Sequence, residues 1–107
     1  MFSIKISTAA KQLKREIYFE RNADNVVETV RARQPSLVIF DLNSSRMRPL
    51  EAIAALKADP ELNAVKTLGY VAHVDSDTIA AARTAGIDEV LARSAFTAQI
   101  GEILTSA

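Results

Sequence analysis

The feature that most constrains this chain is a short, wholly apolar run, residues 37–40, which follows Pro35 and ends before Asp41. Runs of this length and composition are typical of a strand buried on both faces of a parallel sheet. Three further apolar runs are candidate strands, at residues 17–19, 67–71 and 89–92. The sequence therefore predicts four short strands, and we expect the strand that ends at Asp41 to lie in the centre of the sheet.

Helical periodicity fills the stretches between these runs. Apolar residues recur at three- and four-residue spacing around residues 26–32, 50–56 and 96–104, and a further helix is expected from about residue 76. Asp75 and Asp77 suit the start of that helix, and Gly86 suits its end. Strands and helices that alternate at this spacing imply parallel βαβ units, so the predicted fold class is α/β with a doubly wound sheet.

The first residues allow two interpretations. Residues 1–7 alternate apolar and polar side chains as a strand does, whereas the apolar residues at 6, 9, 10 and 13 repeat with helical spacing. Only eight residues separate Ser7 from Glu16, and a parallel crossover needs about a dozen or more. We therefore expect a helix over residues 2–14, with a strand through residues 2–7 as the alternative.

Length, charge and cysteine content exclude several classes of protein. The 107 residues suit one domain spanning residues 1–107. Thirteen basic and thirteen acidic residues balance, which disfavours nucleic-acid or anionic-membrane partners and does not oppose self-association into a homodimer. The chain has no cysteine, so it has no disulfide, thiolate metal site or cysteine nucleophile. No apolar run approaches the roughly 20 residues of a membrane helix, and Lys5 interrupts the N-terminal apolar stretch, so we expect a cytoplasmic protein.

From Pro35 onward the chain resembles the receiver domains of response regulators in two-component signalling. Residues 35–42 are similar to the strand that ends in the family's phosphoacceptor aspartate, a role that falls to Asp41. Residues 85–91, Ala-Gly-Ile-Asp-Glu-Val-Leu, are similar to the family's Ala-Gly-Ala-Asp-Asp-Tyr-Leu stretch. Met47 and Phe96 also stand at or near family positions. The resemblance keeps one ungapped register from Asp41 to Arg93, covers about two thirds of the chain well, and continues weakly back to residue 16.

Several departures from the family pattern concern phosphoryl chemistry. The family's switch serine or threonine corresponds to Val71, which has no hydroxyl, and its lysine corresponds to Arg93. The Met-Pro pair after the phosphoacceptor is replaced by two serines, and the Asp-Gly pair beyond it by Arg48 and Pro49. The acidic pair that holds magnesium follows the family's first strand, and counting back places that pair before Met1. We therefore expect a degenerate receiver that is short at its N-terminus and lacks strand one of the flavodoxin-like sheet.

These departures lead to an expectation about the chemistry. Phosphoryl transfer depends on positioning and on charge stabilisation by a metal and a cation. Asp41 and one backbone carbonyl make a poor site for an ion that demands octahedral oxygen geometry. We therefore expect no metal, no cofactor, no catalytic residue and no enzyme activity. Asp41, taken alone, is also compatible with an ordinary turn- or helix-capping aspartate.

Three functions remain in competition at this point. The first is a stand-alone receiver-like module that acts by protein–protein interaction without magnesium-dependent phosphorylation, its partner being a histidine kinase, a downstream effector or a second copy. The second is a receiver phosphorylated at Asp41 whose first strand was lost to a start chosen too late. The third is a small ligand-binding domain or enzyme on a flavodoxin-like sheet, which the fold alone does not exclude. The sequence does not identify the signalling partner or the pathway.

Two structural expectations complete the prediction. Without strand one, residues 17–19 and 37–40 would both present unpaired edges, and we expect them to close up into four parallel strands, with a homodimer covering the remaining apolar area. Asp41 and Arg93 should meet at one end of the sheet, where the arginine could form an ion pair with the carboxylate. The remaining polar candidates are interpreted as loop or capping residues: Arg46, Arg48, His73, Asp75 and Asp77.

Overall fold

The computed structural model describes residues 6, 8, 10–13, 17–72 and 75–106. Three strands of this part form one parallel sheet in the order β1 (Leu37–Asp41), β2 (Lys66–Val71) and β3 (Glu89–Ala92). The helical elements are η1 (Ala23–Asn25), α2 (Val26–Arg33), α3 (Pro49–Ala58), α4 (Ser76–Ala85) and α5 (Arg93–Ser106). The α/β class, the parallel sheet and three of the four predicted strands are confirmed.

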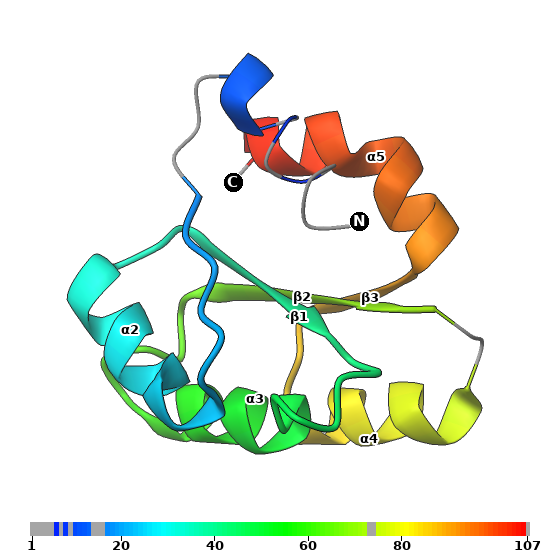
Figure 1. Ribbon diagram of the computed structural model, residues 1–107. Coiled ribbons are helices and arrows are strands. Elements are labelled where there is room, and N and C mark those ends of the chain that lie inside the picture. Colours follow the sequence, from blue (N-terminus) through cyan, green and yellow to red (C-terminus); the bar gives the residue numbers. More distant parts are fainter. Residues whose placement is uncertain (1–5, 7, 9, 14–16, 73–74, 107) are drawn as a thin grey trace.

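Helices cover both faces of the sheet (Figure 1). α2, α3 and α4 lie on one side, where Ile53, Leu56 and Val71 belong to a buried apolar cluster. α5 lies on the other side, where Phe96 and Leu68 form a second cluster with Ile6. Residues 6, 8 and 10–12 are helical, in agreement with the expected N-terminal helix. The rest of residues 2–7, where a strand was the alternative, lies outside the described residues.

The caps predicted for α4 are confirmed. Asp75 is the N-cap, and its carboxylate accepts hydrogen bonds from the backbone N–H groups of Asp77 and Thr78. The hydrogen bonds from the Thr78 hydroxyl and backbone lower the pKa of Asp75, because they favour the charged carboxylate. Gly86 ends the helix with φ of 107°, a left-handed conformation that suits glycine.

The prediction of a fourth strand at residues 17–19 is wrong, and so is its closure against the strand that ends at Asp41. Residues 17–22 form no strand and pass from the layer of α5 to the layer of α2 (Figure 1). Contacts with α2 hold this segment: the Arg33 guanidinium lies 3.7 Å from the centre of the Tyr18 ring, and Glu20 accepts hydrogen bonds from the Thr29 hydroxyl and the Asn22 N–H. These side-chain contacts take the place of a backbone ladder.

The expectation that the Asp41 strand is central is therefore also wrong. Within the described part of the chain, β1 pairs with β2 alone and forms one edge of the sheet, while β2 is the central strand. As an edge strand, β1 has side chains that are only half-buried from Leu37 to Ile39, and Phe40 is its one buried residue. An apolar strand of this kind is usually paired on both sides.

At the amino end of the sheet, Asp88 joins α3, β2 and β3 through a compact polar network. Its Oδ2 accepts hydrogen bonds from the Thr67 N–H (2.8 Å), the Thr67 hydroxyl (3.0 Å) and Lys57 Nζ (3.0 Å). Thr67 is fully buried, so its N–H depends on this carboxylate. Burial acts to raise the pKa of Asp88, but the hydrogen bonds from Thr67 and Lys57 outweigh it and leave that pKa below its ordinary value.

We predict that Asp88→Ala lowers the free energy of unfolding by about 2 kcal/mol, because a buried N–H and a lysine lose a charged acceptor. A carboxylate with a depressed pKa contributes stability above its unfolded pKa of about 3.9, and that contribution is lost as the pH falls through the lower folded value. Urea titrations at pH 7 and below pH 4 test both points. The difference between wild type and variant should shrink in acid, whereas the exposed-residue control Glu28→Gln should stay within about 0.5 kcal/mol of wild type.

Candidate functional site

The candidate site is the carboxyl end of the sheet. β1 ends at Asp41, β2 ends at Val71, and Arg93 begins α5 directly after β3. Asp41 is paired in register with Tyr70, and Val71 with Ala92. Because the strands are parallel, the three residues singled out in the sequence, Asp41, Val71 and Arg93, lie at the same end, where open α/β sheets hold their ligands.

Asp41 is exposed and closes a turn. Its Oδ1 accepts the N–H of Asn43 at 3.0 Å, and its backbone carbonyl accepts the N–H of Ser44 at 3.2 Å. This is the arrangement of a turn-capping aspartate, which was one interpretation of the sequence. The carboxylate therefore stands at the surface with one oxygen already engaged by its own loop.

Tyr70 is a member of this site that the sequence analysis missed. Its ring stacks on Phe96 with centroids 5.1 Å apart, on the side of the sheet covered by α5. Burial, and to a lesser extent the charge of Asp41, raise the pKa of Tyr70 to about 12, while the charge of Arg93 acts to lower it. Asp41 and Arg93 therefore both act on one phenol, which keeps its proton at neutral pH. The ion pair expected between Asp41 and Arg93 remains a prediction.

Val71 faces away from this polar group. It is 2% exposed and belongs to the apolar cluster beneath α3 and α4, together with Ile53 and Ala82. Its side chain offers only methyl groups, so the residue that the sequence resemblance pairs with a switch hydroxyl is part of the core. The backbone N–H of the next residue, Ala72, donates instead to Asn43 Oδ1 at 2.6 Å.

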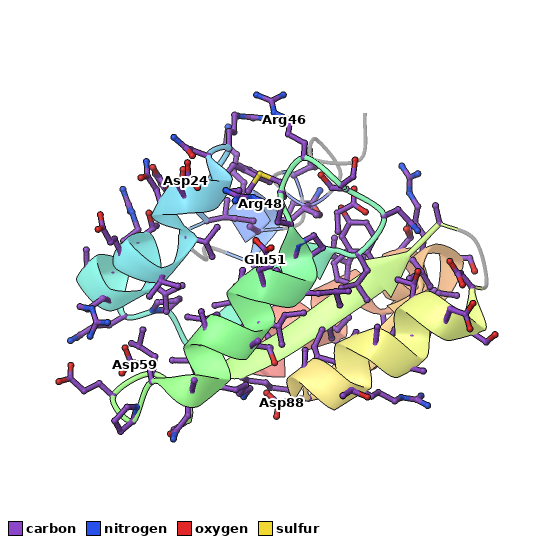
Figure 2. All side chains as sticks on the ribbon, turned by 90° about the horizontal axis from the view of Figure 1, so that it is seen from below. Asp24, Arg46, Arg48, Glu51, Asp59 and Asp88 are labelled. Atoms are coloured by element: carbon purple, nitrogen blue, oxygen red, sulfur yellow. The ribbon has the colours of Figure 1, made fainter. Side chains whose placement is uncertain are left out.

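The loop between β1 and α3 is held at its far end by Arg48. Arg48 forms ion pairs with Asp24 of η1 and, at 3.7 Å, with Glu51 of α3, and Figure 2 shows it between these two acids while Arg46 projects outward. The hydrogen bond and charge of Asp24 raise the pKa of the Arg48 guanidinium. The interpretation of both arginines as mere loop solvation is therefore wrong for Arg48.

A surface cavity of about 400 Å³ lies between this loop and the starts of α3 and α4. Asn43 lines it near Asp41, and Arg48 and Glu51 line it near α3. The other lining residues are Leu42, Ser44, Ser45, Pro49, Leu50 and Thr78. One side of the loop therefore lines this cavity near Asp41, and the other side faces the solvent.

The side chains that the structure describes at this end do not fit a divalent cation. Of the residues at which the three strands end, Asp41 alone carries a carboxylate, and one of its oxygens accepts the Asn43 N–H. Asp75 is occupied as the cap of α4. Among the described residues, no group of three acidic or histidine side chains could hold a metal ion. His73 lies outside the described part of the chain.

Comparison with known proteins places the fold. No protein-family model and no curated protein sequence matches this chain. Its structure is similar to that of the phosphorylated cyanobacterial phytochrome response regulator RcpA, with a TM-score of 0.78 and 20% identity over 97% of this chain and 81% of that one. For a signal receiver domain from Bermanella marisrubri, the TM-score is 0.77 and the identity 19%, over 97% of this chain and 88% of that one. For a two-component response regulator from Legionella pneumophila, the TM-score is 0.76 and the identity 16%, over 98% of this chain and 92% of that one.

The chain thus has the flavodoxin-like fold of response-regulator receiver domains. The likeness extends over nearly all of this chain, so the expected fold family is confirmed. Sequence identities of this size establish the fold, and the chemistry has to be argued from the site. Of the helices described, none combines the length and apolar character that crossing a membrane requires.

A pair of variants at Arg48 tests the geometry of the loop. Arg48 has φ of 45°, a conformation that costs a non-glycine residue about 1–2 kcal/mol. Arg48→Ala and Arg48→Gly both lose the ion pairs, but the glycine relieves the backbone, so we expect Arg48→Gly to be about 1 kcal/mol more stable than Arg48→Ala in chemical denaturation.

The same pair of substitutions at Arg46 is the matched control. The backbone of Arg46 is outside the left-handed region, so glycine there should be no more stable than alanine. An equal gain from glycine at both positions would contradict the strained conformation of Arg48.

Proposed function

We propose that this chain is a receiver-fold signalling module, one domain over residues 1–107, that acts by docking to protein partners without magnesium-dependent phosphorylation. The observation that carries the proposal is the composition of the Asp41 end of the sheet. One exposed carboxylate is present there, the switch position is a buried valine, and the residues do not fit a divalent cation. A phosphoryl group on Asp41 would lack both the metal and the hydroxyl that stabilise it.

The partners that suit such a module are a histidine kinase or a downstream effector. Receiver-fold domains occur within kinases too, since one structural neighbour is the signal receiver domain of a signal transduction histidine kinase from Syntrophus aciditrophicus, with a TM-score of 0.77 and 15% identity. We propose a cytoplasmic location, as the N-terminal sequence pattern suggests, and no nucleic acid or membrane among the partners, because the balanced charge gives no electrostatic footprint for either. On this proposal it is not an enzyme.

A phosphorylated receiver is the second candidate function. Asp41 closes a parallel strand and is exposed, as attack on a phosphoryl donor requires. One neighbour, RcpA, was crystallised in a phosphorylated state, and another, Rcp1, with Mn²⁺ bound. This candidate needs further acidic residues to hold the metal beside Asp41.

Treatment with acetyl phosphate and magnesium distinguishes the two candidates. We predict that the intact mass stays unchanged, because the described side chains beside Asp41 offer too few oxygen ligands for magnesium and Val71 offers no hydroxyl. A receiver that accepts the label serves as the positive control. A mass increase of one phosphoryl group that is absent from the Asp41→Asn variant would contradict the proposal and favour the phosphorylated receiver.

A second copy of the chain is the partner we propose for the open side of the sheet. β1 is an edge strand in the described part, and apolar strand edges attract further strands. Leu13, Ile17 and Tyr18 are the large apolar side chains that stand exposed among the described residues, at 40%, 37% and 50%. All three belong to the segment that precedes α2, and zero net charge does not oppose their association.

Light scattering at micromolar concentration tests the homodimer. We predict a mass of twice the 11.6 kDa of one chain, and a shift toward the single-chain mass in Ile17→Lys, because a charge on this patch would have to be desolvated in the interface. Ala98→Lys on α5 is the matched control and should leave the dimer intact. A single-chain mass for the wild type would contradict the homodimer.

A further inference from the structure

Two backbone N–H groups near Asp41, those of Asn43 and Ala72, already donate to side chains of residues 41–43. The N–H of Asn43 donates to Asp41 Oδ1 at 3.0 Å, and the N–H of Ala72 donates to Asn43 Oδ1 at 2.6 Å. The carboxylate, Asn43 and Ala72 therefore form a continuous series of hydrogen bonds. This series runs from the end of β1 to the residue that follows β2.

Ala72 is the first residue of the connection between β2 and α4. β2 ends at Val71, and α4 begins at Ser76 under the cap of Asp75. Val71 is buried and its side chain has no polar atom, so it cannot form a hydrogen bond that connects it to Asp41. Asn43 spans the distance from the β1–α3 loop to this connection with its own carboxamide.

Both ends of the β1–α3 loop are consequently attached to other elements. Asn43 ties its start to the residue after β2, and Arg48 ties its end to η1 and α3. Turns between them, with backbone hydrogen bonds from Met47 to Ser44 and from Arg48 to Ser45, keep the loop compact. The loop is therefore anchored to the residue after β2 at its start and to η1 and α3 at its end.

We infer that Asn43 is a built-in bridge that couples Asp41 to Ala72, the residue that follows β2, without any covalent change at Asp41. Its amide oxygen accepts the Ala72 N–H, so this backbone donor is engaged by a side chain of the chain itself. The inference rests on the proposed function, because a permanent bridge is useful to a module that signals by docking alone. Asn43 acts through Ala72 and is a positioning residue.

Amide hydrogen exchange followed by NMR tests the bridge directly. Asn43→Ala should speed exchange at Ala72 about fivefold, because the exposed hydrogen bond that protects this N–H is lost. Asn43→Asp keeps an acceptor at the same position and should retain the slow exchange. Ser45→Ala, a neighbouring exposed loop position, is the matched control and should leave Ala72 unchanged. Unchanged exchange at Ala72 in Asn43→Ala would overturn the inference.

A double-mutant cycle separates coupling from local structure. Asp41→Asn weakens the acceptor for the Asn43 N–H, so it should speed exchange at Ala72 about twofold when Asn43 is present. The same change should have no further effect in the Asn43→Ala background. An equal effect of Asp41→Asn in both backgrounds, or no effect in either, would overturn the coupling.

The outcome is independent of the acetyl phosphate experiment. A phosphoryl adduct on Asp41 would defeat the proposed function, yet the exchange at Ala72 would still show whether Asn43 forms the bridge. Conversely, an unlabelled Asp41 together with an equal effect of Asp41→Asn in both backgrounds would leave the proposed function standing and overturn the coupling through Asn43.

Discussion

The parallel register of β1, β2 and β3 is the constraint on which the rest of this structure depends. It brings Asp41, Tyr70 and the start of α5 to one end of the sheet although they are far apart in sequence. It also assigns the two ends different tasks. At the amino end, Asp88 fixes β2, β3 and α3 through charged hydrogen bonds, whereas at the carboxyl end Asp41 and Asn43 are exposed. The fold is therefore anchored by a buried polar network at one end and presents an exposed carboxylate at the other.

Much of this fold could be predicted because its signals are local. The strands that end at Asp41, Val71 and Ala92 are short apolar runs between turns, and α4 carries a capping aspartate and a terminal glycine that need no tertiary information. Residues 17–19 had the same apolar signal, but the segment that contains them contacts α2 through Arg33 at Tyr18 and Thr29 at Glu20, and a local pattern does not include these contacts. The central position expected for β1 failed for the same reason.

The candidate site was predictable in its location and only partly in its members. The family resemblance placed Asp41, Val71 and Arg93 at one end of the sheet, where the structure also has them. Asn43 and Arg48 could not be recognised, because their roles arise from contacts with Ala72 and Asp24, more than twenty residues away along the chain. Tyr70 carried a weak signal, a phenol one residue before the end of a buried strand, which a search for polar groups at strand ends would have found.

The sheet order also has a consequence for how the chain folds. β2 is shared by both strand pairings, so neither β1 nor β3 can join the sheet before it is in place. Each pairing closes over a single helix, α3 or α4, which keeps the loops short and favours rapid formation. We expect the transition state to contain β2 with α3 and α4 packed against it, since these helices also contact one another. β1 would then be the strand whose outer edge stays unpaired longest. This unpaired edge matters most during synthesis, when chains are crowded.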